Sequence, residues 1–597
     1  TYNFIYYSDI VEDKPVTFPV AGNRYAQVSD KYYREIPGIP IAYWISNKTR
    51  DAFLSEESIG TVAPPKQGLA TADNERFLRL WYEVDIQKIG FGISSCDDAV
   101  ASNKKFFPYN KGGAFRRWYG NRDYVVNWEK DGYEIKNFTD EKGKVRSRPQ
   151  NLQYYFKPAI TWSDVTSGSF SGRYAEQGFM FDIKGSSGFP DKKLLPYVLG
   201  LLNSKVAQAF IKILNPTMTT QVGDMTRIPV IKADVDGITL LSKECIDAAK
   251  VDWDSFETSW DFKTHPLIRC VKNKNSYIKD AFENWGIECE QRFRNIKDNE
   301  EKLNQKFIET YGLIGEISSE VDEKYITVRK ADVGRDIRSF ISYAVGCMFG
   351  RYSLDQEGLV YAGGTFDNSK YSTFVPDVDG IIPITDEEYL EDDIVGLFCA
   401  WLKKVYGDET LEENLDFIAK ALGKKGNSSR EIIRNYFLTD FYKDHCSTCS
   451  VTGSGKRPIY WLFDSGKQYG FKALIYLHRY TPDTIGNLRV DYLHRMQRVY
   501  ESEMNRMQDM IEHSTNSREV AVASKRKEKL QKQLKECREY DEKIGHLALD
   551  RIELDLDDGV KYNYRKVQTG RDGKFYEVLA DSKAIMMDAK KYADFKK

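Results

Sequence analysis

The sequence is poor in the features that mark secreted and membrane-spanning proteins. Its 597 residues include nine cysteines, dispersed singly apart from Cys446 and Cys449. An odd, dispersed set favours a reducing interior over a disulfide framework. The sequence has no apolar run of the roughly eighteen residues that a membrane helix needs, and no basic-then-apolar signal segment at its start. These absences predict a cytoplasmic protein with no membrane role.

Two short patterns that could hold a ligand are incomplete. His445, Cys446 and Cys449 have the spacing of a zinc knuckle, but no second ligand pair follows at zinc-finger distance, so we expect no metal. Residues 452–456, Thr-Gly-Ser-Gly-Lys, lack the first glycine of a phosphate-binding loop and its strand-loop-helix context. We interpret this segment as a flexible turn.

Charge is distributed unevenly along the chain. The formal net charge is only -2. Residues 101–150, however, hold twelve Lys or Arg against six Asp or Glu, and residues 151–230 hold eight against five, so 101–230 is net +9 and the remainder net -11. Lysine and arginine that neutralise phosphates supply the sequence-independent part of DNA affinity. The charge therefore predicts a local nucleic-acid surface, whereas residues 377–416, with thirteen acidic residues and two lysines, predict a solvated acidic face or a site for a basic partner.

Basic and aromatic residues are interleaved along residues 104–128. Alternation from Tyr124 to Trp128 predicts a strand, and Lys111-Gly112-Gly113 predicts a hairpin turn. A ribbon that carries arginines can reach phosphates and base edges; the alternative for each side chain is a solvated charged face over an aromatic core. Candidate DNA contacts here are Lys104, Lys105, Lys111, Arg116, Arg117 and Arg122, followed by a second basic run of Lys142, Lys144, Arg146 and Arg148.

Residues 194–230 predict a helix followed by a polar loop. Apolar residues at steps of three and four from Leu195 to Ile213 indicate one buried helical face of about five turns, which Asn215-Pro216 ends. The loop that follows is rich in hydroxyl and other polar groups, which could be presented to a partner: Thr219, Thr220, Gln221 and Arg227.

These residues also carry a resemblance to known proteins. "LLNSK" at 201–205 with "TTQVGDMTRIPV" at 219–230 resembles the closing half of a target-recognition domain from bacterial restriction and modification enzymes. "QGLATADNERFLRLWYEV" at 67–84 resembles the opening signature of that domain, a Gly-x-x-Thr-x-x-Asn turn formed by Gly68, Thr71 and Asn74. The two signatures stand at the separation typical of such domains, which implies DNA recognition.

A narrower resemblance is to the PglX-type adenine methyltransferases of BREX phage-defence systems. It rests on "FFPYNKGGAFRRWYGN" at 106–121, on residues 336–355 and 456–493, and on "EIPGIPIAYWIS" at 35–46, which is similar to the sequence that leaves the catalytic domain. The resemblance also includes "KPAITWSDVTSGSFSGRY" at 157–174 and implies that this segment is a strand and loop of the recognition domain. That adds four candidate DNA contacts: Thr161, Trp162, Ser169 and Arg173.

The motifs for methyl transfer are absent from the chain. Members of this family carry a glycine-containing S-adenosylmethionine (AdoMet) loop and an Asn-Pro-Pro-aromatic tetrad; Asn215-Pro216-Thr217-Met218 lacks the second proline and the aromatic residue. We therefore assign no catalytic, cofactor-binding or metal residues. Because the chain opens on Thr1 without methionine, we expect a fragment, with those motifs upstream and AdoMet as cofactor of the intact enzyme.

The expected fold is mixed α/β and multidomain, with an α/β recognition domain, a helical spacer, and an α/β C-terminal domain with a long antiparallel helical hairpin. The predicted boundaries are an exit segment of the methyltransferase domain at 1–58, the target-recognition domain at 59–235, the spacer at 236–330, the C-terminal α/β domain at 331–490, the hairpin at 491–550 and a tail at 551–597.

The resemblance implies sequence-specific recognition of double-stranded DNA for an adenine-N6 methyltransferase that marks host DNA. Expected partners are DNA, other BREX proteins and a phage-made DNA mimic that inhibits the enzyme. A stand-alone specificity subunit is the alternative, although such subunits usually carry two recognition domains joined by two long helices, and only one signature pair is present. A nuclease-containing modification enzyme is a third hypothesis, without a convincing Pro-Asp…Asp/Glu-x-Lys site in the chain.

Overall fold

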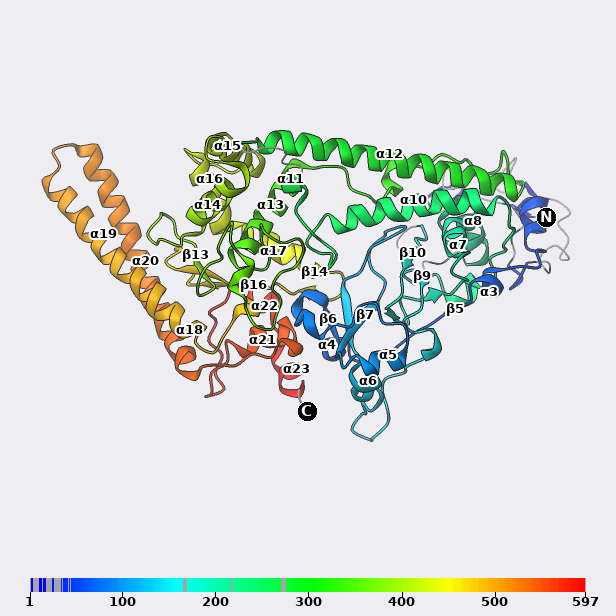
Figure 1. The fold of residues 1–597 in the computed structure, drawn as a ribbon, viewed down its shortest axis with the longest axis horizontal. Coiled ribbons are helices and arrows are strands. Elements are labelled where there is room, and N and C mark those ends of the chain that lie inside the picture. The colour runs from blue at the N-terminus through cyan, green and yellow to red at the C-terminus, as the bar shows by residue number, and fades with distance from the viewer. Residues whose placement is uncertain are drawn as a thin grey trace.

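The computed structural model describes residues 45–597 except 165–168, 216, 218, 270–274 and 596–597, and before residue 45 only 2–3, 10–12, 14–17, 24–25, 34, 36–40 and 42. The predicted exit segment 1–58 therefore lies largely outside the described residues, as do Pro216 and Met218. The protein combines many helices with several small sheets, which confirms the predicted mixed α/β class (Figure 1).

Two four-stranded sheets, in the orders β10-β9-β12-β5 and β11-β7-β8-β6, lie in the part of the chain predicted to recognise DNA, residues 59–235, which we call the recognition region. β7 and β8 are antiparallel, and β8 confirms the strand predicted at Tyr124. Since β11 belongs to one sheet and β12 to the other, residues 182–186 cross from sheet to sheet. The strands are β5 (Pro65–Lys66), β6 (Leu78–Leu80), β7 (Phe106–Asn110), β8 (Tyr124–Asn127), β9 (Ala159–Thr161), β10 (Arg173–Ala175), β11 (Met180–Phe181) and β12 (Ser187–Gly188).

Short elements surround these sheets. The Asp73 side chain caps α4 (Asn74–Phe77), the helix that follows the signature turn, because its carboxylate accepts the Arg76 N–H at 3.1 Å. The other helices are α2 (Asn47–Ala52), α3 (Ile59–Val62), α5 (Cys96–Ala101), α6 (Glu129–Lys136) and α9 (Val222–Met225). Four two-residue strands precede them: β1 (Tyr2–Asn3), β2 (Ile10–Val11), β3 (Lys14–Pro15) and β4 (Arg24–Tyr25).

The helix predicted from Leu195 to Ile213 is broken in two. α7 (Leu195–Asn203) and α8 (Lys205–Leu214) meet at a 69° bend. Ser204 is the cause, because its extended backbone ends α7 while its hydroxyl accepts the Ala207 N–H as the N-cap of α8. Both helices are largely buried. Among the described residues, no single helix is long and apolar enough to cross a membrane; this bent pair passes that test jointly, by length and composition only.

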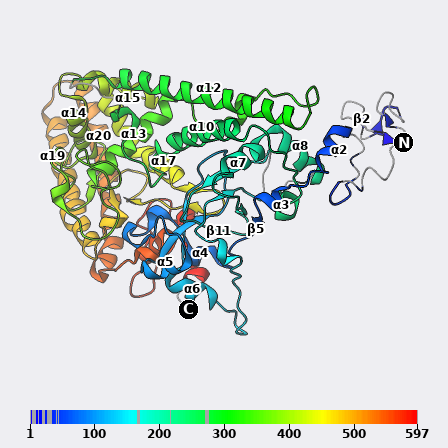
Figure 2. The ribbon, with the colours of Figure 1, turned by 45° about the vertical axis from the view of Figure 1, so that its right-hand side comes forward.

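Long helices run along one side of the molecule. α10 (Val235–Asp254) packs on α7, and α12 (Ile278–Thr310) extends from α7 and α8 to α15 in the C-terminal half, with α11 (Pro266–Arg269) between them (Figures 1 and 2). α12 has its buried face at helical spacing, including Trp285, Phe293 and Phe307. The spacer therefore lies against the recognition region and the C-terminal half.

The C-terminal half surrounds a three-stranded sheet of order β13-β17-β16. Ser465-Gly466 follows β16, and β16 and β17 pair antiparallel, which confirms the two strands predicted there. The elements are α13 (Val333–Met348), β13 (Ile381–Pro383), α14 (Ile394–Tyr406), α15 (Leu411–Leu422), α16 (Ser429–Thr439), α17 (Phe441–Thr448), β14 (Ser450–Val451), β15 (Gly455–Lys456), β16 (Tyr460–Asp464) and β17 (Lys472–Tyr476).

After α18 (Thr484–Asn487), α19 (His494–His513) and α20 (Ser517–Asp550) pack side by side and project from the body (Figure 1). The chain then returns toward the recognition region through α21 (Val560–Lys566), α22 (Ser582–Ile585) and α23 (Ala589–Asp594). Lys561 and Lys591 both form ion pairs with Glu75 of α4 and so connect the C-terminal helices to the recognition region.

The buried apolar residues form two clusters, and the recognition region contributes to both. One joins the β11-β7-β8-β6 sheet to the C-terminal elements and includes Phe107 and Trp461. The other joins α7 and α8 to α10 and α12 and includes Trp162 and Phe210. The two sheets are thus held by different partners, with residues 182–186 running between them.

Candidate nucleic-acid interface

Loops from both sheets gather around the crossing segment. The Asp182 N–H donates to the Asn110 carbonyl (2.9 Å), the Asp164 N–H to the Lys184 carbonyl (3.0 Å) and the Thr220 N–H to the Asp164 carbonyl (2.7 Å). We call residues 110–113, 163–164, 182–186 and 219–221 the junction loops. The structure therefore brings the predicted glycine turn and the predicted polar loop to one place, although they are about a hundred residues apart in sequence.

Glycines allow this close approach. Gly112 has φ +90°, a conformation that L side chains rarely adopt, and a Cβ on Gly185 would lie 2.4 Å from the Asn110 carbonyl oxygen. Lys111 is half-buried, with its ammonium 5.4 Å from the centre of the Tyr124 ring, and burial lowers its pKa. Lys184, which the sequence interpretation missed, is exposed beside it in the junction loops.

A second feature is a protruding hairpin of residues 138–148, which we call the basic hairpin. The Arg146 N–H donates to the Phe138 carbonyl (2.8 Å), and Thr139 and Val145 form an antiparallel bridge. It follows α6 and extends away from the body (Figures 1 and 2). Its four predicted contact residues are exposed and form no ion pair within the part of the chain that the structure describes: Lys142, Lys144, Arg146 and Arg148.

The signature turn connects the basic hairpin to the junction loops. Arg148 exchanges two backbone hydrogen bonds with Ala70, and the Leu69 N–H donates to the Phe181 carbonyl at 2.8 Å. Gly68 is required here because a Cβ would lie 1.8 Å from the Phe181 carbonyl oxygen. The Thr71 hydroxyl, which is buried, donates to the exposed Asn74 side chain at 2.7 Å. Gly68 and Thr71 therefore shape the turn from within.

Two predicted DNA contacts, Arg116 and Arg117, instead form ion pairs with the helical spacer. The Arg116 guanidinium pairs with Asp252 of α10 at 2.7 Å, and that of Arg117 pairs with Glu300 of α12 at 2.8 Å. Both arginines are less than 8% exposed. The physical reason is that Asp252 and Glu300 are themselves buried carboxylates, which need a cationic partner. We correct our prediction for this pair: they clamp the recognition region onto α10 and α12.

Arg122 and Arg173 are corrected in the same way. Arg122 pairs with Glu176 at 2.7 Å and stacks 3.9 Å above the Tyr119 ring. Arg173 is 1% exposed, and its guanidinium donates to the Arg116 carbonyl at 3.4 Å. Burial and the nearby Arg116 lower the pKa of Arg173 to about 10. Neither guanidinium faces solvent, so these arginines are interior groups.

The remaining predicted residues fall into two sets. Some bind other parts of the chain or are buried. Lys105 pairs with Asp557 (2.8 Å), and the Lys104 ammonium donates to the Gln87 carbonyl (2.5 Å). Thr161 is buried, and the buried Trp162 indole donates to the Thr220 carbonyl (3.3 Å). Others reach the surface in part or fully, namely Ser169, Thr219, Gln221 and Arg227, while Thr220 is buried in the junction loops.

Two positioning residues were missed in the "LLNSK" helix region. The Asn203 amide accepts the Gly172 N–H (2.8 Å) and donates to the Gly172 carbonyl (3.1 Å). Gln208 makes the same pair of bonds with Phe170, at 2.9 and 3.1 Å. The signal was available in the sequence, since an asparagine and a glutamine interrupt an otherwise apolar face. They hold the loop before β10 against α7 and α8.

The zinc-knuckle residues have other bonds. His445 Nε2 accepts the backbone N–H groups of Ile459 (3.1 Å) and Tyr460 (3.0 Å), and burial lowers its pKa to about 3, so the ring is neutral. The Cys449 Sγ lies 3.8 Å from the same nitrogen. Over the described ranges, no group of three His, Cys, Asp or Glu side chains is placed to hold a metal ion.

Asp164 in the junction loops predicts a pH dependence. It is 5% exposed, accepts a hydrogen bond from Ser186 (3.0 Å), and burial raises its pKa to about 6. Because the unfolded-state pKa is near 3.9, its favourable contribution is complete below about pH 4 and is lost as pH rises through about 6. We expect Asp164→Asn to unfold at a higher temperature than wild type at about pH 7.5, and the difference to vanish near pH 4. A difference that is constant across this range would contradict the assignment.

Comparison with known proteins shows which class of protein the chain is similar to. No protein-family model matches the chain. The chain is similar to bacterial proteins named adenine-specific methyltransferases. It is 43% identical over 544 residues to adenine-specific methyltransferase PglX of Lacticaseibacillus casei (strain Zhang), which covers 90% of this chain and 45% of that protein. It is 36% identical over 594 residues to adenine-specific methyltransferase BrxX of Escherichia coli O9:H4 (strain HS), covering 93% and 46%.

The chain thus spans somewhat less than half the length of the curated relatives that it matches. Both similarities support the resemblance to PglX-type proteins that the sequence motifs indicated. Nine-tenths or more of the chain is aligned in each case.

Proposed function

We propose that this chain is the DNA-recognition part of an adenine-N6 DNA methyltransferase of BREX type, which marks host DNA. The observation that carries the proposal is the basic hairpin, whose four cationic side chains are exposed and without ion-pair partners in the described structure. Exposed lysines and arginines of this kind neutralise phosphates and release counterions. The relatives' names, adenine-specific methyltransferase, support DNA as the substrate.

The junction loops are the proposed base-reading element. They lie across the signature turn from the basic hairpin, which would track the phosphates while polar groups such as Gln221 reach base edges. Buried hydrogen bonds hold the loops in place, including the bond from the Trp162 indole N–H to the Thr220 carbonyl. A rigid frame under short polar loops is suited to sequence recognition, because contacts must be held within fractions of an ångström.

AdoMet is the cofactor proposed for the intact enzyme, and its site is not assigned to this chain. The glycine turn at 452–456 does not fit the group: Ser450–Val451 pairs antiparallel with Gly455–Lys456, so the turn joins two strands instead of leading into a helix that could bind a ligand. No step of methyl transfer is therefore derived from these residues. Other BREX proteins and a phage-made DNA mimic remain proposed partners of the basic surface.

The test is DNA binding by the chain with the basic hairpin neutralised. We expect the quadruple alanine variant to bind a double-stranded oligonucleotide at least about tenfold more weakly, with a salt slope shallower by about three to four. The substitutions are Lys142→Ala, Lys144→Ala, Arg146→Ala and Arg148→Ala; the control replaces two exposed lysines of α14, Lys403→Ala and Lys404→Ala.

Fluorescence anisotropy over a salt series measures both quantities. The basic hairpin is exposed, so the variant should keep the wild-type unfolding temperature, and the α14 control should keep both affinity and slope. Equal affinities and slopes for the quadruple variant and wild type would remove the basic hairpin from the interface.

A further inference from the structure

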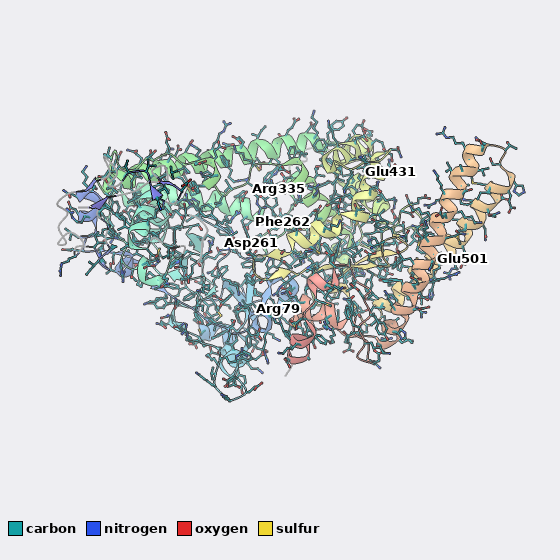
Figure 3. All side chains as sticks on the ribbon, turned by 180° about the vertical axis from the view of Figure 1, so that it is seen from behind. Arg79, Asp261, Phe262, Arg335, Glu431 and Glu501 are labelled. Carbon is teal, nitrogen blue, oxygen red and sulfur yellow. The ribbon has the colours of Figure 1, made fainter. Side chains whose placement is uncertain are left out.

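A cavity of about 530 Å³ lies where the recognition region, the spacer and the C-terminal half meet. Arg335, on its wall, is near the centre of the long axis of the molecule in Figure 3. The volume is within the range of roughly 300 to 1,000 Å³ typical of small-molecule sites. Its walls come from Tyr82, from Asp123 and from three stretches of chain: residues 253–258, 329–342 and 436–451.

Three arginines, Arg329, Arg335 and Arg338, come from one stretch of chain and line the cavity. The Arg335 guanidinium donates to Asp336 (2.7 Å) and to the Lys330 carbonyl (2.8 Å), and Arg338 lies 3.3 Å from Asp444. Arg329 has no carboxylate partner among the described residues; its guanidinium lies 4.2 Å above the Phe256 ring, and burial lowers its pKa. A cation in this position is open to an anionic ligand.

Buried polar atoms elsewhere in the cavity lining also lack partners. The Trp253 indole N–H and the Tyr82 hydroxyl belong to residues only 7% and 6% exposed, and neither atom makes a hydrogen bond in the described structure. One carboxyl oxygen of Glu257 is likewise unpaired, whereas the other accepts the Ser342 hydroxyl at 2.7 Å. Buried polar groups are normally paired, so these atoms are available to bind a ligand.

The charge balance favours an anion over a cation. Besides the three arginines, the ionisable groups facing the cavity are Asp123, Glu257, Asp444, His445 and two tyrosines, Tyr82 and Tyr436. Asp444 already accepts the Tyr436 hydroxyl (2.9 Å) and faces Arg338. Burial raises the pKa of Asp123 to about 6 and that of Glu257 to about 7, so near neutral pH Glu257 carries only part of its negative charge, whereas Asp123 stays largely ionised.

We propose that this cavity binds a small phosphorylated ligand of nucleotide size, with the phosphoryl group at Arg329 and the polar, uncharged part at Trp253 and Tyr82. Guanidinium groups pair with phosphoryl oxygens in a planar, two-bond geometry, and the hydroxyl of Ser339 is a further donor in the cavity lining. The site is separate from the basic hairpin and from the junction loops, so it adds a ligand to the proposed DNA-recognition function.

Isothermal titration of the chain with AMP, inorganic phosphate and adenosine tests the proposal. We expect AMP to bind at least tenfold more tightly than inorganic phosphate, and adenosine to bind more weakly than AMP, because only AMP carries both the phosphoryl group and the polar, uncharged part. Arg329→Met should weaken AMP binding by at least about tenfold, and Trp253→Phe, which removes the indole N–H together with part of the ring, by about three- to tenfold.

The matched control is Arg294→Met on α12, whose side chain is 72% exposed and should leave binding unchanged. Thermal unfolding without ligand checks that each variant folds, and Trp253→Phe retains a test if Arg329→Met does not fold. No heat with AMP or phosphate at millimolar concentration, or equal AMP affinity for wild type and both cavity variants, would overturn the proposal.

Discussion

Arg117→Ala is expected to lower the free energy of unfolding by about 3–5 kcal/mol, because it leaves a buried carboxylate without its cation. Glu300 is 4% exposed and is bound by the Arg117 guanidinium (2.8 Å) and the Trp118 indole N–H (2.7 Å). After substitution only the indole remains. Chemical denaturation of the two proteins measures the loss, and the DNA affinity of the folded variant should equal that of wild type.

The control for this prediction removes both charges. In Arg117→Met with Glu300→Gln, the amide oxygen can still accept the Trp118 N–H and no charge is left unpaired, so we expect most of the lost stability to return. If Arg117→Ala keeps wild-type stability but binds DNA about tenfold more weakly, then Arg117 contacts DNA, as the sequence alone indicated, and the clamp interpretation is wrong.

Glu83→Ala is expected to have an effect of similar size, about 3–5 kcal/mol, at the contact between the recognition region and the C-terminal half. Glu83 is fully buried and accepts the Leu80 N–H (2.7 Å), the Val560 N–H (2.7 Å) and the Arg457 guanidinium (2.9 Å). Its removal leaves Arg457, which is 4% exposed, as a buried unpaired cation. Hydrogen exchange should show faster exchange in β6 and α21 together.

A neighbouring pair provides the comparison for Glu83. Glu75 also links α4 to the C-terminal helices, through Lys561 (3.1 Å) and Lys591 (3.2 Å), but its side chain is 28% exposed. Because partly solvated ion pairs contribute about 0–1 kcal/mol, Glu75→Ala should cost little. Equal losses for Glu75→Ala and Glu83→Ala would show that burial at Glu83 does not set the strength of this contact.

The sequence was sufficient to predict a strand near Tyr124, and insufficient to show which of the arginines around it are buried. The alternation within residues 104–128 correctly indicated a strand at Tyr124. The hairpin turn predicted at Lys111-Gly112-Gly113 is wrong, because the thirteen residues 111–123 join β7 to β8. The local pattern could not show that Arg116 and Arg117 are buried, because their carboxylate partners are 136 and 183 residues away. A guanidinium that pairs internally has the same local sequence as one that contacts DNA.

The helix of residues 195–214 shows the reverse case, in which a local signal was present. Apolar spacing favoured one helix, yet Ser204 is among the best N-cap residues and does start a new helix there. The bend then directs Asn203 and Gln208 onto the backbone of Gly172 and Phe170. Spacing alone misses such a break, because both helices bury their apolar faces in the same cluster.

Lysine-selective labelling with and without DNA tests the central claim most directly. On wild-type protein, a double-stranded oligonucleotide should protect Lys142 and Lys144 of the basic hairpin and Lys184 of the junction loops, all exposed, by at least about threefold in labelling rate. Lys403 and Lys404 of α14 should label equally with and without DNA. Protection of the α14 lysines with none at the basic hairpin would contradict the proposed interface.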